Sequence, residues 1–108
     1  MTNLTATIPA GDSLSTSVDL TNNELAMIFA PAEWTPAHIT FQVSADNINF
    51  SDLFDAAGVE VMRLLRANTA IRLPPAATKA TLYLKIRSGP RTAPVRQTAD
   101  RVFTLVLT

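Results

Sequence analysis

The feature that most constrains this chain is the alternation of apolar and polar residues within short stretches. In ATLYLKIRS, residues 80–88, every second side chain is apolar. Because successive side chains of a β-strand point to opposite faces of the sheet, this pattern predicts a strand with one face in a core. The residues expected to point inward are Leu82, Leu84 and Ile86, and those expected to point outward are Tyr83, Lys85 and Arg87.

Similar stretches recur along the whole chain. Alternation predicts half-buried strands at 4–9, 13–20, 38–44 and 101–108, and a further strand at 69–75. The continuous apolar run at 25–30, which ends at Pro31, predicts a strand buried on both faces. VEVMRLLR, residues 59–66, fits a helical turn or a strand of a hairpin equally well. The fold class is therefore all-β, with a single antiparallel β-sandwich domain (jelly-roll or Ig-like) of about eight short strands over residues 1–108.

The strand assignments predict which residues form the core. Within 13–20, Leu14, Thr16, Val18 and Leu20 are expected to face inward and Ser15, Ser17 and Asp19 outward. After the strand at 38–44, Phe50, Leu53 and Phe54 are expected to pack inward. The full predicted core comprises Leu25, Ile28, Phe29, Ile39, Phe41, Val43, Phe54, Leu82, Leu84, Ile86, Phe103 and Leu105.

Composition places the chain among folded domains. Hydrophobic residues make up 47% of the chain and charged residues 17%, a balance that disordered proteins do not have. No apolar run reaches the roughly 18 residues that a membrane span needs. The opening MTNLTATIPAGDS lacks a basic segment, so we expect no signal peptide, and the absence of cysteine leaves the redox compartment open.

The charges are segregated along the sequence although the net charge is zero. All nine Lys and Arg residues lie between Arg63 and Arg101, whereas eight of the nine acids lie between Asp12 and Glu60. The two halves either pair within one domain or form an acidic and a basic side that favours head-to-tail packing. Nucleic acid is not an expected partner, because the acidic half offsets the field that attracts phosphate.

The acidic stretch SADNINFSDLFDAAGVE, residues 44–60, is the best candidate for a metal site. Its oxygen donors Asp46, Asn47, Asn49 and Asp52 suit Ca²⁺, but the glycine and terminal glutamate of an EF-hand are missing. Asp and Asn are also the residues that tight turns require. We therefore interpret these residues as turn-forming and expect no metal and no cofactor.

An active site is not expected either. His38 is the only histidine, and the chain has no cysteine and no catalytic motif that would supply an oriented base or nucleophile. One binding alternative stays open, since Trp34, His38 and Tyr83 could together form an aromatic platform for a glycan.

Nearly the whole chain resembles a group of small proteins encoded by tailed phages and prophages. The resemblance is most specific in three blocks, which are Pro31 with Trp34-Thr35, then FQVSADNINFSDLFD (41–55), then LKIRSGPRTAPVRQ (84–97). The chain departs from the group's pattern at Asn47, where a glycine is usual, and at Pro90-Arg91; both departures concern turn geometry.

The resemblance implies a virion structural protein with a β-sandwich fold and no enzyme activity. We expect a multicopy capsid decoration or head-surface protein, with a tail or baseplate component and a glycan-binding host-attachment module as alternatives. Its expected partners are the major capsid protein or other virion proteins and copies of itself. The candidate partner-contact residues are Arg91, Arg96, Arg87 and Trp34.

Overall fold

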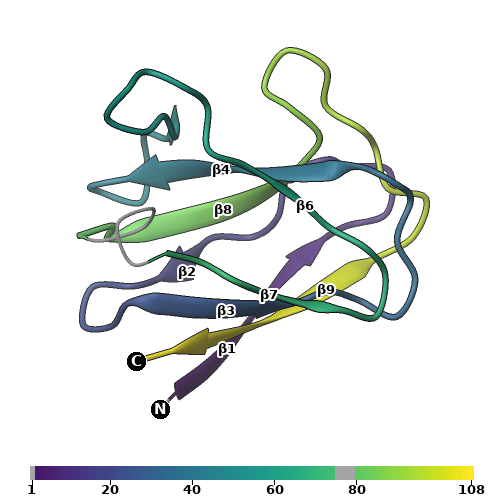
Figure 1. Cartoon of the computed structure of the whole chain (residues 1–108), viewed down its shortest axis with the longest axis horizontal. Coiled ribbons are helices and arrows are strands. Elements are labelled where there is room, and N and C mark those ends of the chain that lie inside the picture. The colour runs from purple at the N-terminus through teal and green to yellow at the C-terminus, as the bar shows by residue number, and fades with distance from the viewer. Residues whose placement is uncertain (1, 75–79) are drawn as a thin grey trace.

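The computed structural model describes residues 2–74 and 80–108, which form nine strands and no helix (Figure 1). The strands are β1 (Thr2–Ile8), β2 (Val18–Asp19), β3 (Leu25–Phe29), β4 (His38–Ser44), β5 (Ser51–Asp52), β6 (Met62–Leu64), β7 (Ala70–Arg72), β8 (Tyr83–Ser88) and β9 (Arg101–Leu107). Within these residues there is thus no helix that could cross a membrane. Pro75, which we expected to end a strand, and Lys79 lie outside the described residues.

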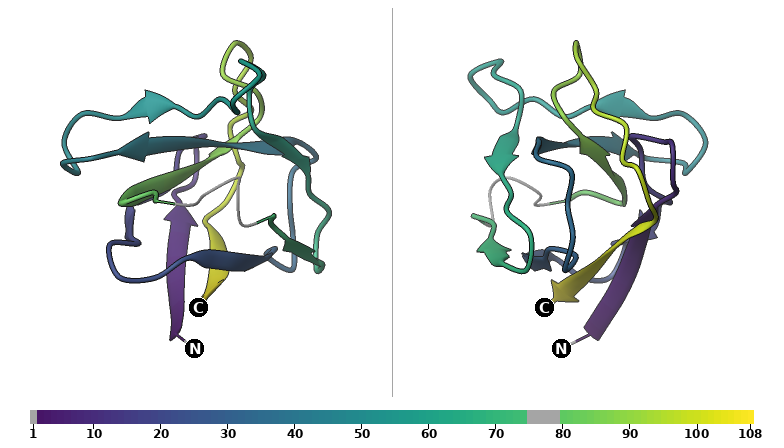
Figure 2. Two further views of the ribbon diagram at one scale, coloured as in Figure 1. Left: turned by 60° about the vertical axis from the view of Figure 1, so that its left-hand side comes forward. Right: turned by 90° about the vertical axis from the view of Figure 1, so that its right-hand side faces the viewer.

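The strands form two antiparallel sheets that pack face to face (Figures 1 and 2). The first sheet has the order β1-β9-β3-β7, and the second has β2-β8-β4-β5 with β6 also paired to β4. This architecture confirms the predicted all-β sandwich. It also resolves the ambiguity at 59–66, because Met62–Leu64 forms a strand rather than a helical turn.

One long ladder organises each sheet. In the first, β1 pairs with β9 from Thr2 opposite Leu107 to Ile8 opposite Arg101, which brings the two ends of the described chain together (Figure 1). In the second, β4 pairs with β8 from Ile39 opposite Ser88 to Ser44 opposite Tyr83. Both ladders join segments far apart in sequence, so the sandwich is held together by long-range pairing.

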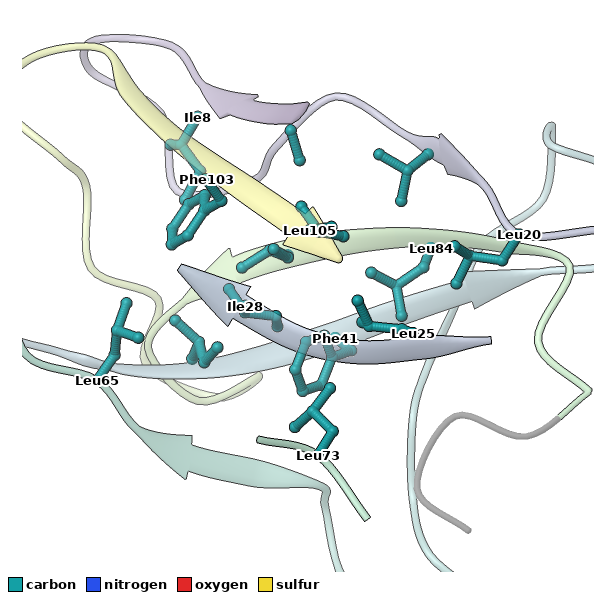
Figure 3. Close-up of a cluster of buried hydrophobic side chains, with 14 of the residues drawn as sticks. Ile8, Leu20, Leu25, Ile28, Phe41, Leu65, Leu73, Leu84, Phe103 and Leu105 are labelled. Atoms are coloured by element: carbon teal, nitrogen blue, oxygen red, sulfur yellow. The ribbon is translucent and has the colours of Figure 1, made fainter. Parts of the chain in front are cut away.

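The core lies between the two sheets, as Figure 3 shows. Phe41 and Phe103 are its largest fully buried side chains, and Trp34 packs edge-on against Phe103 with ring centroids 5.4 Å apart. The alternation predicted most of this core correctly. The predicted core residues that are buried are Leu25, Ile28, Ile39, Phe41, Leu84, Ile86, Phe103 and Leu105, and Val43 is partly buried against them.

Three predicted core residues are instead exposed. Phe29 is 44% exposed because only one face of β3 meets the core, so the expectation of a strand buried on both faces was wrong. Leu82 is 38% exposed, since it lies just before β8 begins. Phe54 is 43% exposed and lies beside the Arg91 guanidinium. Phe50 also lies outside the core, beneath the Lys85 ammonium at 4.3 Å, whereas Leu53 does pack against the core.

The predicted strand at 13–20 is the other correction. Only Val18–Asp19 forms a strand there, and Thr16 is exposed while Ser15 is buried. The reason is a local exchange of hydrogen bonds with β8. The Ser15 N–H donates to the Ile86 carbonyl at 2.8 Å, and the Ser15 hydroxyl accepts from the Ile86 N–H at 2.8 Å. These two hydrogen bonds hold Ser15 against β8, where it is buried although alternation assigned it outward.

Candidate functional site

Arg87 is the centre of the most extensive polar arrangement on the second sheet. It points to the outer face, as the alternation predicts, yet its side chain is only 7% exposed. Its guanidinium donates to the Thr40 hydroxyl at 3.0 Å, to Asp52 Oδ1 at 2.6 Å and to Glu60 Oε2 at 2.9 Å. The planar guanidinium of arginine can donate to two carboxylates at once, whereas the ammonium group of lysine lacks this planar arrangement of donors.

A second arginine completes the arrangement from the loop that follows β8. Arg91 Nε donates to Asp52 Oδ2 at 2.9 Å, and the Arg91 backbone N–H donates to Glu60. The two carboxylates belong to the segment between β4 and β6, so the contacts tie this segment to the loop after β8. We call Thr40, Asp52, Glu60, Arg87 and Arg91 the Arg87 cluster.

The electrostatics of the cluster suit a fixed ion pair. Hydrogen bonds from Arg87 and then from Arg91 lower the pKa of Asp52 to about 2. The carboxylate is thus ionised at neutral pH, and both of its oxygens are occupied by guanidinium donors. Because this carboxylate becomes protonated only in strong acid, the arrangement is suited to holding chain segments in position rather than to transferring protons near neutral pH.

The segment that supplies Glu60 is a short hairpin closed by a tight turn. Phe54 and Glu60 are bridged, and the Gly58 N–H donates to the Asp55 carbonyl at 3.0 Å. The Asp55 side chain accepts hydrogen bonds from the Ala57 N–H at 2.9 Å and from the Val59 N–H at 3.0 Å. Gly58 takes a φ of +79°. A tight turn therefore occupies residues 55–58 within the acidic stretch 44–60.

The proposed calcium donors are used in other ways. The Asp46 carboxylate accepts from the backbone N–H groups of Asn49 and Ile48, which hold its pKa well below the usual range, and from the Ser44 hydroxyl. Asn47 accepts from Ser17, and Asp52 belongs to the Arg87 cluster. Across residues 2–74 and 80–108, no group of three or more His, Cys, Asp or Glu side chains is placed to hold a metal ion.

Asn47 takes a backbone conformation in which glycine is the usual residue. Its φ is +61°, in the left-handed region where glycine is favoured and where asparagine is the next most tolerated residue. The turn thus keeps a left-handed geometry without the glycine.

A buried network anchors the far end of the loop after β8. Gln97 is fully buried and donates to the Ser88 hydroxyl at 2.7 Å and to the Thr35 carbonyl at 3.1 Å. Its side-chain oxygen accepts from the Thr35 N–H and from Arg101 Nε, both at 3.0 Å. The loop from Gly89 to 100 is therefore fastened at both ends, by the Arg87 cluster and by Gln97.

The aromatic platform that stayed open as an alternative does not assemble. Trp34 is buried, and its indole N–H donates to the Ala37 carbonyl at 3.1 Å. His38 begins β4, whereas Tyr83 pairs with Ser44 at the other end of that strand. Six residues of extended chain separate these two positions by about 20 Å, too far for one sugar ring to bridge.

The four candidate partner-contact residues fall into two pairs. Arg87 and Trp34 are buried and bonded within the domain, so they are parts of its framework. Arg91, 46% exposed, and Arg96 present their side chains to solvent from the loop after β8. Figures 1 and 2 show this loop standing beside the segment between β4 and β6 on the same side of the molecule.

Exposed apolar side chains lie in the segment that Arg91 contacts. The centroid of the Phe54 ring is 5.7 Å from the Arg91 guanidinium carbon. Val59 and Met62, which are 61% and 41% exposed, line a groove together with Phe54. We call Phe54, Val59, Met62 and Arg91 the loop surface. Its mixture of aromatic, methionine and arginine side chains is the composition enriched in protein–protein interfaces.

Sequence reasoning did not foresee the partners inside the framework. Nothing in the spacing of Asp52, Glu60 and Arg87 marks them as neighbours, and Gln97 was not singled out at all. The sequence blocks at 41–55 and 84–97 described above do contain Asp52, Arg87 and Gln97, but no feature of those blocks indicates that these side chains hold the loops.

Comparison of the chain with protein-family models, with curated proteins and with solved structures found no match.

Proposed function

We propose that this chain is a structural protein of a tailed-phage virion, present in many copies as a decoration protein on the capsid surface. The observation that carries the proposal is the Arg87 cluster together with the loop surface that it supports. Two loops are fixed to each other by ion pairs, and the exposed side chains above them are apolar residues and arginine. A surface ordered in advance loses little conformational freedom when it binds a partner.

The resemblance adds the partner class. The blocks where the resemblance is most specific contain Asp52, Arg87 and Gln97 of the framework, whereas Val59 and Met62 lie outside those blocks. A protein of that group would keep the fold through the first set and choose its docking partner through the second. We infer that the partners are the major capsid protein or other virion proteins and further copies of this chain, and that the protein is not an enzyme.

Copy number in purified particles tests the location. Particles of the phage or prophage that encodes this chain would be analysed by quantitative mass spectrometry against a labelled standard of the purified protein. We expect hundreds of copies per particle. A small multiple of three or six would favour the tail or baseplate alternative, and absence from the particles would refute a virion role. A glycan array would test the host-attachment alternative.

A second experiment tests the docking surface. Binding of the purified protein to particles that lack it would be measured for wild type, for Arg96→Glu and for Arg72→Glu. Arg72 is a matched control, because it is exposed but lies in β7 of the first sheet. We expect Arg96→Glu to weaken attachment and alter its dependence on salt, and Arg72→Glu to leave both unchanged. Equal effects of the two would remove the loop after β8 from the interface.

A further inference from the structure

The first sheet has one long edge with unused hydrogen-bonding groups. At its C-terminal half β1 is covered by the segment before β2: the Thr16 N–H donates to the Thr7 carbonyl at 2.9 Å, and the Thr7 N–H donates to Thr16 Oγ1 at 3.2 Å. Both backbone groups of Thr7 therefore point away from β9. Because the direction alternates along a strand, those of Asn3 and Thr5 point the same way.

Nothing within residues 2–74 and 80–108 covers this edge at Asn3 and Thr5, for which no hydrogen bond on that side is found. Figures 1 and 2 show the N-terminal half of β1 running past the rest of the sandwich beside the C-terminus. The free edge thus offers two N–H donors and two carbonyl acceptors, spaced two residues apart.

The edge also lacks the devices that keep monomeric sheets from pairing. TNLTATI contains no charged residue, no proline and no glycine, and its pairing with β9 runs through seven consecutive residue pairs without a bulge. Proteins that remain monomeric place charges, prolines or bulges on such edges, or keep them short. The other described edge strands, β2, β5, β6 and β7, are only two or three residues long.

We propose that β1 pairs with β1 of a second copy of this chain, antiparallel about a two-fold axis at Leu4. In this register Asn3 lies opposite Thr5 of the second copy, and Thr5 lies opposite Asn3 of the second copy. Each pair exchanges two backbone hydrogen bonds, so all four free groups of each chain are satisfied. The first sheets of the two copies become one continuous sheet.

Two observations favour a second copy over an unrelated strand. The free groups at positions 3 and 5 are symmetric about position 4, which is the condition for a strand to satisfy itself across a two-fold axis. Leu4 is partly buried against the core, so at that axis it would meet Leu4 of the second copy on the inward face and extend the core across the interface. No charge on β1 opposes the approach.

The inference does not depend on where the protein is found, and its test uses the isolated chain. Sedimentation velocity from about 10 µM to about 1 mM should show a reversible monomer–dimer equilibrium, because an interface of one strand pair is small and weak. Thr5→Pro removes an outward N–H and leaves the β1–β9 hydrogen bonds intact. It should weaken the dimer by about tenfold or more, whereas Thr5→Val, which keeps the N–H, should not. Circular dichroism checks that each variant is folded.

Cross-linking tests the register. The chain has no cysteine, so Leu4→Cys introduces a single thiol. Residues opposite each other in a non-hydrogen-bonded antiparallel pair have Cα atoms about 4.5 Å apart, within the range for a disulfide. Leu4→Cys should oxidise to a covalent dimer, and Val102→Cys, 48% exposed on the neighbouring strand β9, should not. A monomer at about 1 mM, a dimer indifferent to Thr5→Pro, or equal cross-linking of the two cysteines would overturn the proposal.

Discussion

Replacing Arg87 with methionine tests whether the Arg87 cluster holds the loops in place. The guanidinium is 7% exposed and donates to Thr40, Asp52 and Glu60 at 3.0, 2.6 and 2.9 Å. Methionine is flexible enough to occupy much of the same space but provides none of these hydrogen bonds. The variant therefore leaves two carboxylates that have lost their main partner.

The loss of unfolding free energy in Arg87→Met depends on which partners Asp52 and Glu60 keep. Removing one partner of a buried ion pair costs about 3–5 kcal/mol, because the other charge is left without a partner. Asp52 keeps Arg91 at 2.9 Å and is 23% exposed, while Glu60 keeps the Arg91 backbone N–H. We therefore expect the free energy of unfolding to fall by about 3 kcal/mol, near the lower end of that range. With a urea m-value of about 1.5 kcal/mol/M, the unfolding midpoint moves down by about 2 M.

The assay is urea unfolding followed by the fluorescence of Trp34, the only tryptophan, which is 9% exposed in the folded state. Arg96→Met is the matched control: the same substitution at an exposed position of the same loop should change the free energy of unfolding by no more than about 0.5 kcal/mol.

A triple variant separates two contributions to the loss of stability: the missing arginine side chain, and the carboxylates that it leaves unpaired. Arg87→Met combined with Asp52→Asn and Glu60→Gln carries no unpaired carboxylate, so it should regain part of the lost stability. The reasoning is refuted if Arg87→Met costs less than about 1 kcal/mol, or if the triple variant is no more stable than the single one.

Four further predictions concern the core, a turn, pH and calcium. Phe41→Ala removes a fully buried ring and should lower the free energy of unfolding by about 3–5 kcal/mol in the same urea assay; a loss below about 1 kcal/mol would contradict its place in the core. Gly89→Ala should be more destabilising than Gly11→Ala, since both have φ near +85° but only at position 89 would a Cβ come within 2.8 Å of backbone atoms; equal melting temperatures would count against this. Because the folded-state pKa of Asp52 is about 2, lower than its ordinary value of 3.8, its ion pairs stabilise the fold above pH 4 and this contribution is lost as the pH falls towards 2. At this partly exposed site it amounts to about 1–2 kcal/mol, and Asp52→Asn should flatten the acid limb of a stability-versus-pH curve. Added calcium and added chelator should both leave the melting temperature unchanged, and a shift of several degrees would make Asp46 a ligand.

The two-residue period predicted the strands well wherever one face of a strand meets the core. Ile39 and Phe41 are buried inward and β4 runs from His38 to Ser44, as the alternation required. The apolar run LAMIF carried less information, because five consecutive apolar residues do not say which face is covered. Phe29 was therefore misplaced, and its exposure became visible only once the neighbouring strands were known.

The candidate site could not be predicted in the same way. Alternation correctly put Arg87 on the outer face of β8, and an outer face would ordinarily be exposed. Its burial depends on the path of two loops, which no periodicity describes. The carboxylates that cover it, Asp52 and Glu60, are 35 and 27 residues away in sequence. Only the three-dimensional path of the chain brings them together.

Some of the charges that are segregated along the sequence pair with each other in the fold. Each ion pair found among the described residues joins an acid of the first 60 residues to an arginine of the remainder, so part of the asymmetry is used within the domain. Three other basic residues lie in or between β6 and β7 at one edge of the sandwich: Arg63 in β6, Arg66 after it and Arg72 in β7.

β1 and β2 contact each other at the opposite edge. Asp19 lies there in β2, whereas β1 carries no charge. Two hypotheses of self-association, pairing of β1 and head-to-tail packing of the segregated charges, predict different responses to salt. Pairing of β1 with a second copy uses backbone groups and Leu4, so added salt should leave it nearly unchanged. Head-to-tail packing of an acidic edge on a basic one would weaken as the Debye length falls from about 10 Å at 0.1 M ionic strength to about 3 Å at 1 M. A dimer that survives 1 M salt but is lost in Thr5→Pro is formed by the strand edge, and one with the reverse behaviour is formed by the charges.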